Sequence, residues 1–145
     1  WEQNNTQENS VRTDLTCGAT MVGFDPEHLR RVLVNLLDNA LRYAGVNADS
    51  IQVATARSPT GQVTMVVWSD GLPLEPSVER HLFEPFFSSE SRSTDLGLYI
   101  CRELCDGHGA AIAFARTRRL VGGVPVDGNE FRVRFALAPS DKMQT

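Results

Sequence analysis

Residues 25–44 read Asp-Pro-Glu-His-Leu-Arg-Arg-Val-Leu-Val-Asn-Leu-Leu-Asp-Asn-Ala-Leu-Arg-Tyr-Ala, and this stretch predicts the long helix on which the fold is built. Asp25 is a favourable N-cap residue, and Pro26 suits the first helical position. Apolar residues recur every three or four positions and form one stripe: Leu29, Val32, Leu33, Leu36, Leu37, Ala40 and Leu41. Gly45 follows the stripe and can end the helix. A helix with one apolar face has to bury that face against another layer.

The chain on either side of this helix predicts strands and two further helices. Strands are expected at 51–57, 62–68, 110–116 and 130–137, with an earlier strand pair at 11–15 and 20–24; helices are expected near 77–81 and at 95–106. Helices on one face of a mixed, mainly antiparallel sheet make a two-layer α/β sandwich of the α+β class. Residues 1–10 are polar and aperiodic and are interpreted as a flexible tail or linker remnant. The folded domain is expected at 11–138, with a C-terminal tail at 139–145.

Composition excludes several classes of protein. A chain of 145 residues is long enough to bury one hydrophobic core. Its 18 acidic and 14 basic residues give a formal net charge of −4, which argues against a nucleic-acid partner. No window approaches the ~18 consecutive apolar residues of a membrane span, so no direct membrane contact is expected. Three cysteines without disulfide-framework spacing fit a reducing cytoplasm.

The polar side of the long helix carries a group of residues with ligand-binding chemistry. Asn35, Asn39 and Arg42 fall on the face opposite the leucines, with Tyr43 just beyond. Two carboxamide oxygens and a guanidinium could hold a hydrated Mg²⁺ and phosphate oxygens. A solvated polar face is the alternative, and this helix alone favours it.

Two later segments are also ambiguous when each is taken alone. Residues 69–74 run from a strand into a glycine-containing loop, which can bring backbone close to a ligand but is also typical of an ordinary turn. Residues 82–87 form an apolar anchor, followed by the polar segment 88–93 and a helix N-terminus near Asp95. Since helix N-termini favour anions, this segment is either a lid over a phosphate site or a surface loop beside a capped helix. Cys101 and Cys105 share a helix face, but without further ligands they fit buried thiols better than a metal site.

The order of these segments resembles the ATP-binding catalytic domain of bacterial sensor histidine kinases, over about residues 25–137. DPEHLRRVLVNLLDNALRYA is similar to the asparagine box of that family, and HLFEPFFSS to its phenylalanine box. VVWSDGLPLEP and STDLGLYICRELCDGHGA fall where its two glycine boxes belong. The resemblance is nearest to short-lid kinases of nitrogen and pilus regulation. It implies a Bergerat (GHKL-type) fold that binds Mg-ATP between the long helix and the lid.

The resemblance also implies roles for individual residues and partners. Asn39 is the implied Mg²⁺ ligand, with Asn35 beside it and Arg42 and Tyr43 near the phosphates. The other implied nucleotide-site residues come from the glycine boxes and the lid: Ser69, Asp70, Gly71, Pro73, Arg92, Thr94, Asp95, Leu96, Gly97 and Leu98. The implied partners are a dimerisation hairpin that bears the phosphorylated histidine and the receiver domain of a response regulator. The implied location is the cytoplasm, including the cytoplasmic part of a membrane-anchored sensor.

Both glycine boxes depart from the family pattern. Ser69 stands where the family has an Asp that accepts a hydrogen bond from the adenine amino group, and Pro73 replaces a glycine. Ser93 and Asp95 replace two glycines of the second box, and Asp95 adds a carboxylate near the phosphates. The lost hydrogen bond and the added repulsion together approach ~5 kcal/mol, or about a thousandfold to ten-thousandfold in affinity. The sequence therefore predicts weakened or lost ATP binding, in either a histidine kinase domain or a non-enzymatic pseudokinase module that acts by docking.

Overall fold

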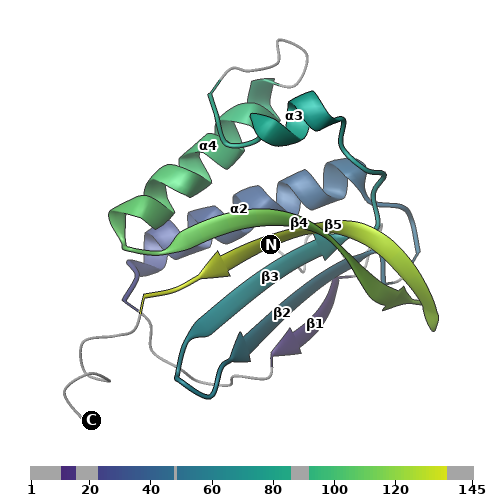
Figure 1. The fold of residues 1–145 in the computed structure, drawn as a ribbon, viewed down its shortest axis with the longest axis horizontal. Helices are drawn as coiled ribbons and strands as arrows, with labels where there is room; N and C mark the ends of the chain where they lie inside the picture. The colour runs from purple at the N-terminus through teal and green to yellow at the C-terminus, as the bar shows by residue number, and fades with distance from the viewer. Residues whose placement is uncertain (1–10, 16–22, 48, 86–91, 137–145) are drawn as a thin grey trace.

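The computed structural model describes residues 11–15, 23–47, 49–85 and 92–136, and for 11–15 and 92–95 it describes the backbone alone. Its elements are, in order, β1 (Val11–Leu15), α2 (Pro26–Tyr43), β2 (Ile51–Arg57), β3 (Val63–Ser69), α3 (Pro76–Arg80), α4 (Arg92–Gly107), β4 (Ala111–Val121) and β5 (Val124–Arg134). The five strands form one sheet in the order β1-β2-β3-β5-β4. Only the β1–β2 pair is parallel among these strands. Helices α2 and α4 pack on one face of the sheet (Figure 1), so the predicted two-layer sandwich is confirmed.

The long helix α2 begins as its sequence predicts. The side chain of Asp25 accepts hydrogen bonds from the backbone N–H groups of Glu27 and His28, at 2.9 and 3.2 Å. The hydrogen bond from the His28 N–H is the main reason that the pKa of Asp25 lies below its ordinary value. The apolar stripe faces the sheet, and its most buried members are Val32, Leu36, Leu37 and Ala40.

The two faces of the sheet carry different cores. The face under the helices contributes Val67, Phe131 and other apolar residues to the main core that α2 and α4 cover. The opposite face has a smaller cluster around Trp68, which is fully buried. The β4–β5 hairpin is bonded to this opposite face, because Trp68 Nε1 donates to the Thr117 carbonyl and Gln52 Nε2 donates to the Leu120 carbonyl, at 3.1 and 2.8 Å. The outer part of the hairpin therefore covers Trp68 and Gln52 on the face that the helices leave open.

Some predicted boundaries are wrong. The strand expected at 110–116 continues to Val121, and the strand expected at 130–137 runs instead from Val124 to Arg134. The two meet in a tight turn at Gly122 and Gly123, both of which have positive φ. Helix α4 begins at Arg92 rather than at 95, since Ser93 and Thr94 do not interrupt a helix as glycine does.

The expected strand at 20–24 is absent from its described part, because residues 23 and 24 form a bend. The expected tails at 1–10 and 139–145, the segment 86–91 and Cys17 lie outside the described residues.

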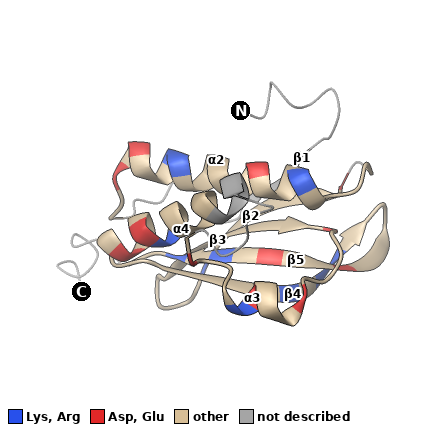
Figure 2. Cartoon of the chain, turned by 90° about the horizontal axis from the view of Figure 1, so that it is seen from above, with Lys and Arg blue, Asp and Glu red and all other residues tan. Residues whose placement is uncertain are grey.

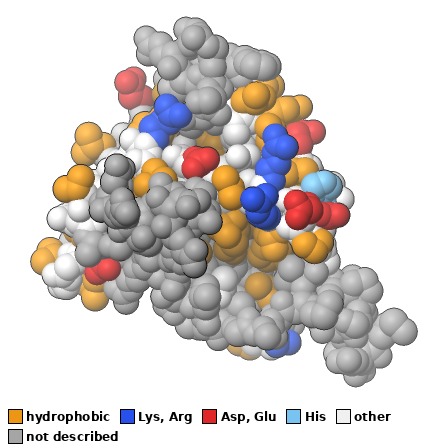
Figure 3. Space-filling model, turned by 180° about the vertical axis from the view of Figure 1, so that it is seen from behind, with side chains coloured by type: hydrophobic (Ala, Val, Ile, Leu, Met, Phe, Trp, Pro, Cys, Tyr) orange, Lys and Arg blue, Asp and Glu red, His pale blue; other side chains and the backbone are white. Residues whose placement is uncertain are grey.

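Charged residues of both signs are distributed over the described surface. Figure 2 shows acidic and basic residues on both α2 and α4. On the face shown in Figure 3, described side chains of both charges lie among apolar ones, without a large patch of one sign. None of the described helices has the length and hydropathy of a membrane span.

Candidate functional site

The first asparagine of the α2 pair, Asn35, contacts α4. Asn35 Nδ2 donates a hydrogen bond to the carbonyl of Gly97 at 3.3 Å. A Cβ on Gly97 would lie 3.8 Å from Asn35 Cγ, so the two helices are close at this point. Asn39 lies one helical turn further along α2 and is half-buried, as is Asn35. Neither asparagine therefore lies on a fully solvated face, and Asn35 contacts α4 directly.

The C-terminal end of α2 meets the loop that follows β3. Gly71 packs so closely against this end that an added Cβ would lie 3.0 Å from the Tyr43 carbonyl oxygen and 3.1 Å from Asn129 Nδ2. A side chain here would push on backbone, so this position favours glycine. Tyr43 itself is 42% exposed. The close packing joins the asparagine helix to the predicted first glycine box.

Asp70 holds the loop between α2 and β2. Its Oδ1 accepts from the backbone N–H of Gly45 at 2.8 Å, and its Oδ2 accepts from the Ser50 hydroxyl at 2.9 Å. The backbone N–H of Asp70 also donates to the Ser50 carbonyl at 3.0 Å. Both carboxylate oxygens thus bond within the protein, and Asp70 acts as a brace rather than as an open acceptor for a ligand.

Ser69 is the last residue of β3 and is only 4% exposed. Alternation along β3 places it on the same face as Val67, which is the face covered by the helices. Its partner in register on β5 is Asn129, and the partner of Asn129 on β4 is Arg116. Ser69 therefore lies in a polar row that crosses the end of the sheet beside the Gly71 loop.

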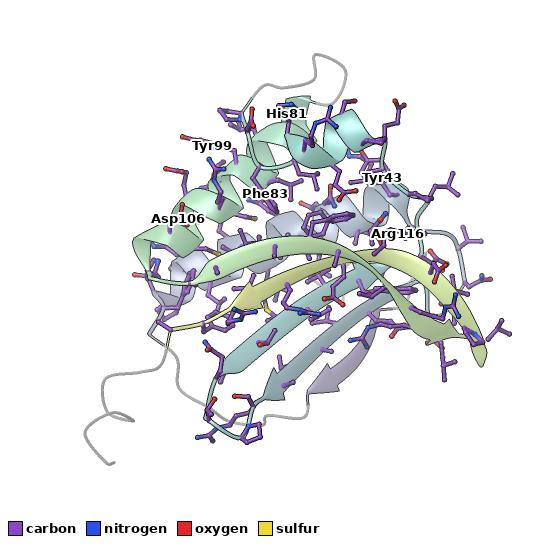
Figure 4. The ribbon with its side chains drawn as sticks, in the orientation of Figure 1. Tyr43, His81, Phe83, Tyr99, Asp106 and Arg116 are labelled. Atoms are coloured by element: carbon purple, nitrogen blue, oxygen red, sulfur yellow. The ribbon has the colours of Figure 1, made fainter. Side chains whose placement is uncertain are left out.

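The sequence analysis missed the other two members of this row. Arg116 Nη1 donates to the Gly71 carbonyl at 2.7 Å and to Asn129 Oδ1 at 3.1 Å. Asn129 Nδ2 donates to the Leu72 carbonyl at 3.1 Å. Figure 4 shows the Arg116 side chain on β4, toward the end of α2 that carries Tyr43. The available signal was the alternation of Ile112, Phe114 and Arg116, which places a charged residue on the apolar face of a strand.

Some residues of the phenylalanine box and of the second glycine box pack in the core, and others lie at the surface. Phe83 packs edge-on against Phe131, with the ring centroids 6.2 Å apart (Figure 4). Leu98 is 1% exposed and belongs to the core, so its side chain is not available to a ligand. Leu96 is 37% exposed and Pro73 is exposed. The backbone of Arg92, Thr94 and Asp95 forms the first turn of α4, and their side chains lie outside the described part of the structure.

The two cysteines of α4 are structural. Cys101 and Cys105 are both fully buried, and the Cys101 thiol lies 3.6 Å from the Val32 carbonyl. Burial raises the pKa of Cys101 to about 12 and that of Cys105 to about 11. The sequence analysis expected buried thiols, and thiols with such pKa values are not ready nucleophiles.

The described residues fit a magnesium–phosphate ligand better than a metal held by the protein alone. Among them, no cluster of three His, Cys, Asp or Glu side chains could hold a metal ion. Mg²⁺ usually takes only one or two protein ligands and completes its shell with water and phosphate oxygens, which suits the single carboxamide of Asn39. The 16-residue helix α4 begins at Arg92, in the turns that precede the Gly97 contact with Asn35, and a helix N-terminus attracts anions.

Comparison with known proteins shows which family this chain resembles. Residues 24–139 match the family described as histidine kinase-, DNA gyrase B-, and HSP90-like ATPase. The chain is 35% identical over 132 residues to the sensor protein kinase PilS of Pseudomonas aeruginosa, covering 89% of this chain and 24% of PilS. It is 37% identical over 102 residues to the sensor protein KdpD of Escherichia coli, covering 67% of this chain and 11% of KdpD. The chain thus spans a quarter or less of the length of these relatives.

Solved structures agree with this placement. The catalytic domain of the histidine kinase ThkA, in a nucleotide-free form, superposes with a TM-score of 0.75 at 26% identity, covering 96% of this chain and 86% of that chain. Full-length ShkA in complex with AMPPNP superposes with a TM-score of 0.70 at 20% identity, covering 92% of this chain and 27% of that chain, and shows the same fold. The chain therefore belongs to the family of histidine kinase-, DNA gyrase B- and HSP90-like ATPases, with the sequence and fold of a sensor histidine kinase catalytic domain.

Proposed function

We propose that residues 11–138 form the nucleotide-binding catalytic domain of a cytoplasmic sensor kinase of the pilus- and nitrogen-regulation type, and that its ATP binding is weakened. The hydrogen bond from Asn35 to the Gly97 carbonyl is the observation that carries the proposal. It joins the asparagine helix to the helix whose N-terminus would receive phosphate. The identity to PilS supports the subtype, and the AMPPNP bound to the related fold of ShkA supports the choice of an adenine nucleotide.

The proposed reaction transfers the γ-phosphoryl group of ATP to a histidine on a separate dimerisation hairpin, from which a receiver domain takes it. The bond between the γ-phosphorus and its bridging oxygen breaks, and its electron pair leaves with ADP. A phosphorus–nitrogen bond forms to the imidazole, which releases its N–H proton. Mg²⁺, held through Asn39, would supply positive charge to offset the charge that develops on the phosphate oxygens.

The residues of this chain would contribute positioning. Asn39 would hold Mg²⁺ through its carboxamide oxygen, while Asn35 keeps α4 against α2. Arg42 and Tyr43, in the last turn of α2, would lie near the phosphates. Since phosphoryl transfer depends mostly on positioning and charge stabilisation, changes in the glycine boxes would act through geometry.

The proposed weakening has two sources. Ser69 supplies a hydroxyl where the related kinases carry a carboxylate, and Asp70 does not replace that carboxylate because both of its oxygens are engaged. Asp95, in the first turn of α4, adds a negative charge at the end of the helix where phosphate would bind. Both changes reduce the affinity for ATP without removing the asparagine scaffold.

A titration of the chain with ATP in one Mg²⁺ buffer, followed by calorimetry, tests this proposal. Ser69→Asp and Asp95→Gly should each raise the affinity, and the double variant should gain nearly the sum, because the two sites act on different ends of the ligand. Asn39→Ala should remove the Mg²⁺ dependence, whereas Asn47→Ala, an exposed asparagine in the loop after α2, should not. Micromolar binding by the unmodified chain would disprove the weakening, and a folded double variant without affinity would disprove the assigned site.

A docking module without catalysis is the second candidate. Arg116 and Asn129 hold the Gly71–Leu72 loop by hydrogen bonds that need no nucleotide, which is what a module that folds without ATP requires. Phosphoryl transfer to the dimerisation hairpin of the parent protein separates the two candidates. Incorporation of phosphate that depends on Asn39 favours the kinase, and binding to the hairpin without incorporation favours the docking module.

A further inference from the structure

Strand β4 forms one edge of the sheet, and its outer side is uncovered in the described structure. The strand order ends at β4, which pairs only with β5 (Figure 1). At 11 residues it is more than twice as long as the other edge strand, β1, which has 5. Residues 111–120 are all exposed or half-buried, and no backbone hydrogen bond joins them to a described element other than β5. A long uncovered edge of this kind is a template for one more strand.

The hydrogen bonds of the neighbouring strands show which backbone groups of β4 point outward. Phe135 directly follows β5 in the same register, and its N–H donates to the Val63 carbonyl at 3.0 Å. The odd-numbered residues of β5 therefore bond to β3. Because backbone groups alternate in direction along an antiparallel strand, the even-numbered residues of β5 bond to β4, where their partners are odd-numbered. The N–H and C=O groups of the even-numbered residues within 112–118 thus point away from β5, toward the open edge.

The first half of β4 lacks the usual features that protect an edge strand. Its register with β5 is continuous along all 11 residues without a bulge, and the strand contains no proline. Ala111 and Ala113 are exposed, and their small uncharged side chains leave room for an incoming strand. The second half differs, since it carries three arginines within four positions: Arg116, Arg118 and Arg119.

These arginines belong to the basic part of an acidic chain. Of its 14 basic and 18 acidic residues, 5 and 2 lie in the β4–β5 hairpin, residues 111–134, which has a net charge of +3. The rest of the chain keeps 9 basic and 16 acidic residues, a net charge of −7. Among the described residues, only Arg118 of the three β4 arginines forms an ion pair, with Asp127, and that pair is exposed and therefore weak. The edge thus combines open backbone groups with positive charge that the hairpin does not neutralise.

We propose that the outer edge of β4 binds an extended acidic segment of a partner protein, which adds a sixth strand to the five-stranded sheet. The outward backbone groups of β4 hydrogen-bond to the main chain of the segment, and its carboxylates meet Arg118 and Arg119 on opposite faces of the sheet. Main-chain pairing supplies affinity, and the arginines select an acidic sequence. A second copy of this chain fits less well, since pairing the arginine-bearing halves of two β4 strands sets like charges side by side. The inference does not depend on the proposed nucleotide binding.

A pair of synthetic peptides provides a matched test. The probe is a labelled peptide of about ten alternating Glu and Thr residues, the length of a long strand, and its control replaces every Glu by Gln. In fluorescence anisotropy with the 145-residue chain, the Glu peptide should bind in a salt-sensitive manner and about tenfold or more tighter than the Gln peptide. Arg118→Ala and Arg119→Ala should each weaken the binding about two- to fivefold, the range of an exposed ion pair. Arg57→Ala, which removes an exposed arginine from β2, should leave the binding unchanged.

Hydrogen exchange separates strand addition from loose electrostatic binding. In the free chain, the outward amides of Ile112, Phe114 and Arg118 should exchange faster than those of Ala113 and Ala115, which bond to β5. A saturating concentration of the Glu peptide should slow the outward amides about tenfold or more and change the inward amides little. Contact between charged side chains alone would not produce this alternating pattern.

Several results would overturn the proposal. Failure of the Glu peptide to bind the folded chain would mean that the arginines only guard the edge against pairing. Binding without protection of the outward amides would make the hairpin a charged patch and not an acceptor for a strand. Tighter binding of a single-stranded oligonucleotide would assign the arginines to nucleic acid, and a stable dimer in sedimentation would assign the edge to a second copy. Thermal melts of each variant establish that the comparison is made on folded protein.

Discussion

Asp70 accepts a hydrogen bond from the backbone N–H of Gly45 at 2.8 Å, which joins the residue after β3 to the loop that follows α2. The second oxygen of the same carboxylate accepts from Ser50, the residue that precedes β2. One side chain thereby fixes the path of the chain from the long helix into the sheet. The place of Asp70 in the predicted first glycine box suggests a ligand-binding role, whereas its contacts are those of a structural brace.

Asp70→Asn should lower the free energy of unfolding by about 1–3 kcal/mol, because an amide cannot accept both hydrogen bonds and leaves one partner unpaired. Urea unfolding followed by Trp fluorescence measures this. Asp127→Asn is the matched control, since it breaks an exposed ion pair with Arg118 and should change stability little. Equal losses in the two variants would contradict the bracing role of Asp70.

Leu36→Ala should destabilise the fold by about 2–5 kcal/mol, since Leu36 is fully buried between α2 and the sheet and its truncation leaves a cavity. Leu72→Ala makes the same chemical change at a side chain that is 84% exposed and should alter stability by less than about 0.5 kcal/mol. The two midpoints in urea provide the comparison. A small effect of Leu36→Ala would mean that the apolar stripe does not carry the core.

Gly128→Ala should be strongly destabilising for a steric reason. A Cβ at this position would lie 2.3 Å from the Ser69 carbonyl oxygen and 2.4 Å from the ring of Trp68, so the strands would have to separate. Forced overpacking of this kind costs about 1–3 kcal/mol or more. Gly107→Ala is the control, because an added Cβ there meets nothing within 4 Å. The melting temperature should fall for the first variant and hold or rise for the second.

Stability should decline at alkaline pH through the buried thiols. The ordinary pKa of a cysteine is 9.0, and burial raises the pKa of Cys101 to about 12 in the folded chain. The unfolded chain therefore loses this proton first, and the contribution of Cys101 to stability is complete below pH 9 and is lost as the pH rises toward 12. Cys101→Ala should remove part of this loss. Urea unfolding at pH 7 and pH 10 should show the gap between the parent and Cys101→Ala narrowing at the higher pH; a constant gap would refute the assignment.

Much of the architecture was determined by local sequence pattern. The cap at Asp25, the proline at Pro26 and the apolar spacing that follows predict α2 with its buried face, and the structure confirms all three. The order of the sequence motifs was sufficient to predict the family, because each motif combines residue type with spacing along the chain. Periodicity is a local property, and a single sequence carries it in full.

The details of the site were decided by tertiary contacts. Arg116 is 45 positions from Gly71, and Asn129 is 57 positions from Leu72. The pairing of β4 with β5 brings both side chains to this loop. Asp70 reaches Gly45 and Ser50 because the end of β3 and the start of β2 lie side by side at one edge of the sheet. No spacing along the chain reveals this neighbourhood. Hydrogen bonds between distant strands depend on how the strands pair and on the direction in which each side chain points. The sequence by itself therefore determined which helices and strands form. The packed structure decided which polar groups bond to one another and which were left for a ligand.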